Sequence, residues 1–457
     1  MSLERALDLA RAGRGVAEAD FFEELRIPSV STLPSHRDDV RRNCEWLADR
    51  FRSLGLDASI TDVVDGGHPV LRADWRGAGE APTLTLYGHY DVQPPDPVEE
   101  WVSPPFEPTV RDGLVYARGS ADNKGNHMAA LKAAEHALAA GGPPVNLRFL
   151  LEGEEEITGP SLPTYVRQHA ADLATDYVLV WDGGFSPDGR PELVTGLRGI
   201  LYVELEATGP AIDLHSGGFG GNAPNPLNTL ARILGELKDR DGRITIPGFY
   251  DGVRPPETGE MADWDRSAEF GETLRGLMRA SVLEGESEYS AAERAWSRPT
   301  LDVNGFVGGF TGEGKKTVIP ARGSAKVSMR LVPGQDPMRI LDALCEYVDE
   351  LTTPGVRVEV KLLGAAPPVL TGASHPGAVA LASAFEASFG LPAARLRTGG
   401  SIPVAIDFQE ALGAPMMISG LSQPGSGAHS PNEKFSLDHF HRGTEALIRL
   451  MWSLGPT

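Results

Sequence analysis

The sequence predicts an α/β protein with a mostly parallel sheet, helices on both faces, and an α+β domain inserted into the chain. Apolar strand-like runs at 83–88, 145–151 and 177–180 alternate with helical patterns, which is typical of a parallel sheet. Each of these runs ends in histidine or acidic residues, and the pattern changes near residue 198. Because ligands bind beyond the carboxyl ends of parallel strands, we expect a site at that edge.

Length and charge limit the classes of protein to consider. A chain of 457 residues is too long for one ordinary core, so two domains are expected. Asp and Glu number 63 against 42 Lys and Arg, giving a formal charge of −21. This charge disfavours nucleic acid and anionic membranes as partners. With no apolar run of membrane-spanning length and no secretory signal at the start of the sequence, we expect a cytoplasmic enzyme.

The elements of the first domain follow from apolar spacing. Apolar residues four and three positions apart predict a helix over 37–55, and alanine-rich sequence closed by glycines and prolines predicts another over 124–140. After a return to this domain, helices are expected at 377–389 and 437–454. Its predicted strands are 57–64, 69–75, 83–88, 145–151, 177–180 and 415–419.

The middle of the chain has a different character. An alternating strand at 199–208 and an amphipathic helix at 225–239 precede a polar, acidic stretch over 255–298. Further elements are predicted as strands at 316–320, 322–332 and 356–363 and a helix at 337–352. The predicted boundaries are therefore 1–197 and 373–457 for the first domain and 198–372 for the insertion. Cys44 and Cys345 occupy apolar positions of helices and are expected as buried free thiols.

His89 and Asp91 stand at the end of the strand 83–88. Residues i and i+2 of extended chain share a face, so the Asp91 carboxylate is expected to reach the His89 imidazole. A carboxylate on one ring nitrogen fixes the tautomer and leaves the other nitrogen free for a metal. In isolation, however, this pattern is more typical of a capped histidine at a strand end.

The acidic and histidine residues downstream strengthen the metal hypothesis. Two histidines with several carboxylates suit Zn²⁺, Mn²⁺ or Co²⁺ rather than Ca²⁺. There are too many acids for one ion, which favours two cations sharing a carboxylate. Adjacent Glu155 and Glu156 diverge, so one can bind metal while the other acts as general base. The candidates are His89, Asp91, Asp122, Glu155, Glu156, Asp182 and His429.

A series of short motifs runs in order along nearly the whole chain: Gly88-His-Tyr-Asp91, Gly119-Ser-Ala-Asp-Asn-Lys-Gly125, Glu155-Glu156, Asp182, Asp213-Leu-His-Ser-Gly217 and Gly427-Ala-His-Ser-Pro-Asn-Glu-Lys434. Together these motifs resemble those of the M20 metallopeptidases, with the carnosinase-like dipeptidases as the most similar branch.

The resemblance implies a role for each matched residue. His89 and Asp182 would hold one metal, His429 and Glu156 the other, with Asp122 bridging them. Glu155 would be the general base, Asp91 the residue that orients His89, and His215 the residue that stabilises the oxyanion. The implied contacts with a substrate carboxylate are Thr317, Arg330 and Ser401.

The resemblance also implies an activity. We expect a hydrolase with two divalent ions per subunit, Zn²⁺ first and Mn²⁺ or Co²⁺ as alternatives, that cleaves dipeptides or short peptides with a free carboxylate. The alternative is an N-acyl-amino-acid amidohydrolase, of the deacetylase or desuccinylase type, on the same scaffold. The insertion would be a lid and dimerisation domain of a homodimer, and the Asp122–Asn123 peptide bond would be cis. The remaining histidines are not expected as ligands, and Arg198 and Arg322 are interpreted as surface charges.

Overall fold

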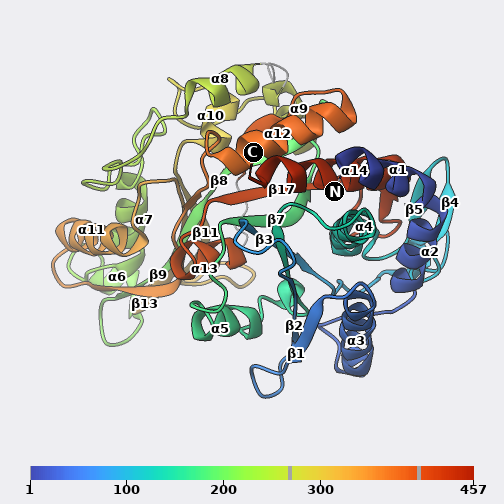
Figure 1. The fold of residues 1–457 in the computed structure, drawn as a ribbon. Coiled ribbons are helices and arrows are strands. Elements are labelled where there is room, and N and C mark those ends of the chain that lie inside the picture. Colours follow the sequence, from blue (N-terminus) through green and yellow to red (C-terminus); the bar gives the residue numbers. More distant parts are fainter. Residues whose placement is uncertain (1, 266–269, 399–402, 457) are drawn as a thin grey trace. The chain divides into compact units, whose positions relative to one another are not determined.

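In the computed structural model, which describes residues 2–265, 270–398 and 403–456, the chain divides into two units (Figure 1). Unit 1 comprises Met1–Thr195, Thr371–Arg395 and Pro403–Thr457, and unit 2 comprises Gly196–Leu370 and Leu396–Ile402. Leu396, which the sequence places in the first domain, belongs to unit 2.

A mixed sheet forms the centre of unit 1, with strand order β1-β2-β6-β3-β7-β17-β8. The pairings β6–β3, β3–β7 and β7–β17 are parallel, whereas β1–β2, β2–β6 and β17–β8 are antiparallel. The expectation of a mostly parallel sheet is therefore wrong outside the four central strands. The connection from β1 to β2 is too short for a parallel crossover, so this pair is antiparallel. The strands are β1 (Asp57–Thr61), β2 (Val70–Trp75), β3 (Thr83–His89), β6 (Asn146–Glu152), β7 (Tyr177–Gly184), β8 (Glu192–Leu197) and β17 (Met416–Ser422).

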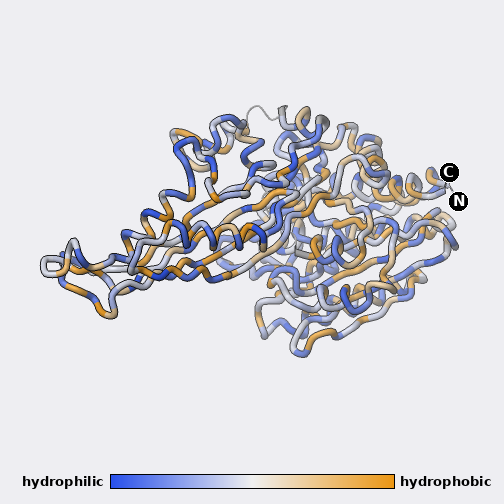
Figure 2. Tube along the Cα trace, turned by 90° about the vertical axis from the view of Figure 1, so that its left-hand side faces the viewer, coloured by the Kyte–Doolittle hydropathy of each residue, from blue (hydrophilic) through white to orange (hydrophobic). Residues whose placement is uncertain are grey.

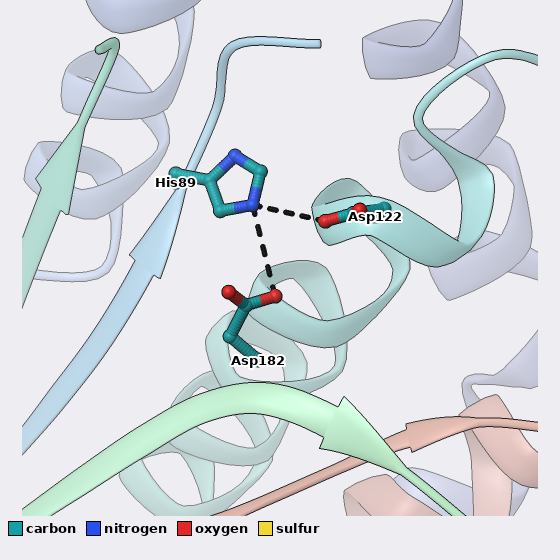
Figure 3. A group of neighbouring side chains, drawn as sticks. All are labelled: His89, Asp122 and Asp182. Atoms are coloured by element: carbon teal, nitrogen blue, oxygen red, sulfur yellow. Dashed lines mark hydrogen bonds and ion pairs between the residues drawn. The ribbon is translucent and has the colours of Figure 1, made fainter. Parts of the chain in front are cut away.

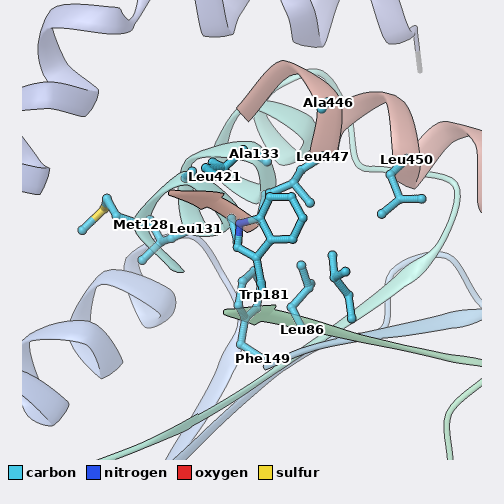
Figure 4. Close-up of a cluster of buried hydrophobic side chains, with 14 of the residues drawn as sticks. Leu86, Met128, Leu131, Ala133, Phe149, Trp181, Leu421, Ala446, Leu447 and Leu450 are labelled. Atoms are coloured by element: carbon cyan, nitrogen blue, oxygen red, sulfur yellow. The ribbon is translucent and has the colours of Figure 1, made fainter. Parts of the chain in front are cut away.

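Helices cover both faces of this sheet because side chains along its strands alternate between them. Leu86 of β3 and Trp181 of β7 face α4 (Gly125–Ala139) and α14 (Leu437–Leu454), as Figure 4 shows. Tyr87, the next residue of β3, instead packs edge-on against Phe408 of α13 (Pro403–Ala411), with 5.7 Å between ring centroids. The indole of Trp181 is fully buried and forms part of this core.

The remaining described elements of unit 1 surround this core. The strand-like runs and helices predicted in this unit each contain an observed element, but the helices α1, α2, α5 and α13 and the strands β4, β5, β8 and β18 were not predicted. These elements are α1 (Leu3–Ala12), α2 (Arg14–Leu25), α3 (Arg37–Ser53), α5 (Ser161–Gln168), α12 (Pro376–Phe389), β4 (Thr109–Arg111), β5 (Leu114–Tyr116) and β18 (Lys434–Ser436).

Unit 2 is built on an antiparallel sheet of order β11-β13-β9-β14. Residues of β9 alternate between buried and partly exposed. Figure 2 shows hydrophilic and hydrophobic residues interspersed along the whole Cα trace. The buried face packs under α7 and α11. The elements are β9 (Gly199–Thr208), β11 (Thr300–Gly308), β13 (Arg322–Leu331), β14 (Arg357–Ala366), α7 (Pro226–Glu236) and α11 (Pro337–Leu351).

The polar stretch 255–298 contains three helices that the sequence did not predict: α8 (Thr258–Asp265), α9 (Phe270–Met278) and α10 (Ala291–Trp296). A capping box of Ser290 and Glu293 starts α10, and that pattern is readable in the sequence. Among the described helices, none has the length and apolarity needed to cross a membrane. Cys44 is buried as expected, but Cys345 is partly exposed on α11.

Candidate active site

Four neighbouring parallel strands of unit 1 deliver acidic and histidine side chains to one edge of the sheet. His89 is the last residue of β3, and Asp182 lies near the end of β7. Glu155 and Glu156 lie in a 3₁₀ turn that follows β6, and His429 lies in the loop after β17. The predicted concentration of these residues beyond the carboxyl ends of the strands is therefore observed.

The first ligand group consists of His89, Asp122 and Asp182 (Figure 3). His89 Nε2 lies 3.0 Å from Asp122 Oδ1 and 3.7 Å from Asp182 Oδ1. On the other side of the ring, His89 Nδ1 lies 3.1 Å from the backbone oxygen of Asp91 and 3.4 Å from Asp91 Oδ1. The Asp91 carboxylate therefore reaches the imidazole, as predicted, and the Asp91 carbonyl contacts the same ring nitrogen.

The second group consists of Asp122, Glu156 and His429. His429 Nε2 lies 3.0 Å from Asp122 Oδ2 and 3.1 Å from Glu156 Oε2. Asp122 therefore belongs to both groups, and each of its two carboxylate oxygens faces a different histidine.

The donor set fits a pair of divalent cations. Within each group, one ligand atom from each residue lies within 4.8 Å of the others. Ligand atoms about 2.1 Å from a tetrahedral Zn²⁺ lie roughly 3.4 Å apart, close to the observed nitrogen–oxygen separations. One imidazole with two carboxylates in each group suits Zn²⁺, Mn²⁺ or Co²⁺.

Charges in the site shift the pKa values of its members. Burial opposes ionisation of His89, but the Asp182, Asp122 and Asp91 carboxylates raise its pKa well above the usual value. Hydrogen bonds to Asp122 and Glu156 raise the pKa of His429 to about 10. Because protons and metal ions compete for the same nitrogens, metal binding must release protons.

The three consecutive glutamates have different surroundings. Glu154 is buried, and its two oxygens accept hydrogen bonds from the backbone N–H groups of His68 at 2.6 Å and Ser161 at 2.9 Å. Glu156 faces His429 and belongs to the second ligand group. Glu155 belongs to neither ligand group, and its carboxylate does not share the backbone contacts of Glu154. Burial raises the pKa of Glu155 to about 7, and neighbouring carboxylates act in the same direction.

Residues beside the predicted ligands fix their orientation. Gln93 Nε2 donates to Glu156 Oε2 at 2.9 Å, and Asn123 Nδ2 donates to Asp182 Oδ1 at 2.6 Å. Neither function was predicted from the sequence, although Asn123 directly follows Asp122 and Gln93 lies two positions after Asp91. The Asp122–Asn123 peptide bond is cis, as predicted.

The other predicted site residues belong to unit 2 or lie outside the described residues. His215 is exposed on a short strand, β10 (Leu214–His215), where the backbone N–H of Ser216 donates to Thr317 O at 3.0 Å. Arg330 lies on β13, partly exposed. Ser401 is outside the described residues.

The interpretation of Arg198 as a surface charge is wrong. Its side chain is buried, and Nη2 donates to the backbone oxygens of Arg294 and, at 2.7 Å, Arg298. These carbonyls lie at and just beyond the C-terminal end of α10, where a cation compensates the unpaired carbonyl groups. Arg322 is exposed, as predicted.

Comparison with known proteins identifies the family. The family model described as peptidase family M20/M25/M40 matches residues 85–453, which is most of the chain and spans both ligand groups. The chain belongs to the M20 peptidase family. The resemblance drawn from its motifs is thereby confirmed.

Relatives of this M20 peptidase match it over nearly their whole lengths. The Beta-Ala-His dipeptidase of Mus musculus is 29% identical over 91% of this chain and 88% of its own. The Cys-Gly metallodipeptidase of Candida albicans is 30% identical over 93% of each. A crystal structure of an M20 family metallo-carboxypeptidase from Sulfolobus solfataricus superimposes with a TM-score of 0.78 at 32% identity, covering 96% of this chain and 99% of that one.

Proposed function

We propose that this M20 peptidase is a di-metal-dependent hydrolase that cleaves the amide bond of dipeptides or short peptides with a free C-terminal carboxylate. The observation that carries the proposal is the position of Asp122, whose Oδ1 and Oδ2 face His89 and His429, respectively. A shared carboxylate between two half-sites is the arrangement that paired cations require. The dipeptidase names of the mouse and Candida relatives support the substrate class.

Two divalent ions would be held at this site, with Zn²⁺ as the first choice and Mn²⁺ or Co²⁺ as alternatives. His89 and Asp182 would hold one, Glu156 and His429 the other, and Asp122 would contact both. When bound, such cations polarise the scissile carbonyl and acidify an attacking water.

Glu155 would act as the general base. It lies beside both ligand groups without belonging to either, and burial favours proton uptake by raising its pKa to about 7. Positive charge nearby lowers a carboxyl pKa, so the working value in the loaded enzyme would be lower. Glu155 would take the proton of the attacking water and return it to the leaving amine.

Unit 2 would supply the contacts for the rest of the substrate. A guanidinium fork bonds a carboxylate bidentately, so Arg330 is suited to hold the substrate C-terminus, with Thr317 and Ser401 as further contacts. His215 would donate a hydrogen bond to the oxyanion. We accordingly propose 1–197 and 373–457 as the catalytic domain, apart from Leu396–Ile402, which clusters with unit 2, and 198–372 as the lid and dimerisation domain.

A homodimer formed through the lid and dimerisation domain is part of the proposal. Apolar side chains are exposed on the two edge strands of its sheet, including Phe306 and Val307 on β11 and Leu362 and Leu363 on β14. Exposed apolar groups on sheet edges are typical of surfaces that associate. The cytoplasmic location stays a prediction.

A substrate panel on metal-reconstituted protein tests the activity. We expect hydrolysis of unmodified dipeptides and strongly reduced turnover of the same dipeptides with an amidated C-terminus. N-acetyl and N-succinyl amino acids should be poor substrates. Faster cleavage of the N-acyl amino acids than of every dipeptide would contradict the proposal in favour of the amidohydrolase alternative.

A further inference from the structure

The fully buried carboxylate of Glu433 contacts the backbone of Asp122, the ligand shared by both groups. Glu433 has no exposed surface and accepts four hydrogen bonds. Its Oε2 accepts from Arg118 Nη1 at 2.7 Å and from the backbone N–H of Gly119 at 2.8 Å. Its Oε1 accepts from the backbone N–H groups of Ala121 at 2.8 Å and Asp122 at 3.0 Å.

These contacts offset the cost of burying a charge. An isolated buried carboxylate is strongly unfavourable, but one paired with a guanidinium and fixed by amide groups is tolerated. Every one of the four donors belongs to 118–122, the segment that ends at the shared ligand. Glu433 therefore fixes the direction from which the Asp122 side chain leaves the backbone.

The same residue anchors the second histidine. His429 lies four positions before Glu433, has a positive φ of 61°, and its side chain is 55% exposed. With so little packing around the imidazole, its position depends on how the loop is held. The backbone oxygen of Glu433 accepts from Ala117 N at 3.2 Å, and Lys434 N donates to Ser426 O at 2.8 Å, closing the loop.

Asn432 extends this anchoring to a third segment. Its Oδ1 accepts from Val102 N, and its Nδ2 donates to Glu100 O, both at 2.8 Å. Two residues that follow His429, Asn432 and Glu433, are thus hydrogen-bonded to residues more than 300 positions away in the sequence.

We propose that Glu433 is a positioning residue that aligns Asp122 and His429, so that both half-sites are assembled by one buried carboxylate. This inference rests on the proposed function, because it assumes that these two residues hold metal. Glu433 belongs to neither ligand group, and three of its four donors are backbone N–H groups, so it acts through the backbone. Removing its charge should weaken the binding of both ions together, because Asp122 belongs to both ligand groups.

The test compares Glu433→Gln with Glu445→Gln in the full chain. Glu445 is also largely buried and pairs with Arg11 at 3.0 Å and Arg14 at 3.4 Å, but it belongs to neither ligand group. Metal-free protein is titrated with Zn²⁺ by calorimetry, and the unfolding temperature of the metal-free protein is measured alongside. We expect Glu433→Gln to weaken both ions by about 10–100-fold and Glu445→Gln to leave both affinities at the wild-type value.

A lower unfolding temperature with unchanged Zn²⁺ affinities would show a purely structural role and overturn the inference. Weaker binding of only one Zn²⁺ ion would overturn the claim that Glu433 aligns both half-sites. If Glu433→Gln fails to fold, Glu433→Asp keeps the charge on a shorter arm and should weaken both ions in the same direction; unchanged affinities would again overturn it. Wild-type protein that binds no Zn²⁺ would refute the proposed function as well, which separates the two failures.

Discussion

Asp91 holds the backbone of Glu155 in place: its Oδ1 accepts a hydrogen bond from the Glu155 N–H at 3.3 Å. Its Oδ2 accepts from the N–H of Glu156 at 3.1 Å, and Oδ1 also lies 3.4 Å from His89 Nδ1. One buried carboxylate therefore links a metal-ligand candidate to the turn that carries the general-base candidate. Such shared anchoring keeps reacting groups in register to within fractions of an ångström.

Glu155→Gln should remove most turnover and leave the metal content near that of the wild type. The amide is almost the same size but cannot accept the proton, and loss of a general base costs about 10²–10⁴ in rate. Turnover and bound metal are measured on the same preparation. If Glu155→Gln loses metal while Glu156→Gln retains it, the two glutamates have exchanged roles.

Arg330→Ala should lower kcat/KM for dipeptides by about 10–100-fold, since a hydrogen bond to a charged group contributes roughly 1.5–3 kcal/mol. Arg322→Ala is the matched control, because Arg322 is an exposed arginine on the same strand. For a C-terminally amidated dipeptide, the wild type and Arg330→Ala should be nearly equal. An equal loss on free and amidated substrates would contradict a carboxylate contact.

Stability should depend on pH through Glu192, which belongs to neither ligand group. Burial raises the pKa of Glu192 from 4.5 to about 7, with Asp188 acting in the same direction. The folded state therefore retains a proton that the unfolded state loses, and the stability contributed below pH 4.5 disappears as pH rises to 7. The loss should be on the order of 1–3 kcal/mol.

Urea unfolding at pH 5 and pH 7 measures this effect. Glu192→Gln should flatten the fall in unfolding free energy between the two pH values. Glu410→Gln, at an exposed carboxylate of the same unit, should leave the fall unchanged. A fall of the same size in Glu192→Gln would show that another group is responsible.

Complementation tests whether His215 acts across the proposed dimer. His215→Ala and Glu155→Ala should each be inactive alone. In a mixed dimer, the chain that keeps Glu155 would receive the intact His215 of its partner, restoring one competent site. Activity should then approach half that of the wild-type dimer. Verified heterodimers that stay inactive would show that His215 works within its own chain or that the dimer is arranged differently.

Much of the site could be predicted from local sequence because its residues follow strand ends. His89 and Asp182 come at or near the ends of apolar runs, and parallel neighbours bring such ends together. The family resemblance supplied the bridging role of Asp122, and the structure supplied the geometry that supports it. The two carboxylate oxygens of Asp122 face two different histidines. This arrangement depends on the backbone conformation of 118–122, which no local sequence pattern specifies.

Long-range contacts account for what was missed. The bond from Arg118 to Glu433 joins residues 315 positions apart, so spacing gives no signal for it. Arg198 was interpreted from the sequence as a surface charge, but its side chain is buried and its guanidinium donates hydrogen bonds to backbone carbonyls. The prediction of a mostly parallel sheet did not identify the antiparallel outer strands, because strand patterns alone do not reveal strand direction.

The central claim is that Asp122 unites two metal sites, and the most direct measurement is the number of Zn²⁺ ions bound per chain during reconstitution of metal-free protein. Bound metal and dipeptidase activity are recorded together, for the wild type and for Asp122→Ala. The wild type should approach two equivalents, with full activity only near the second, and Asp122→Ala should lose both ions together. Saturation at one equivalent with full activity, or an Asp122→Ala protein that retains one tightly bound ion, would contradict the claim.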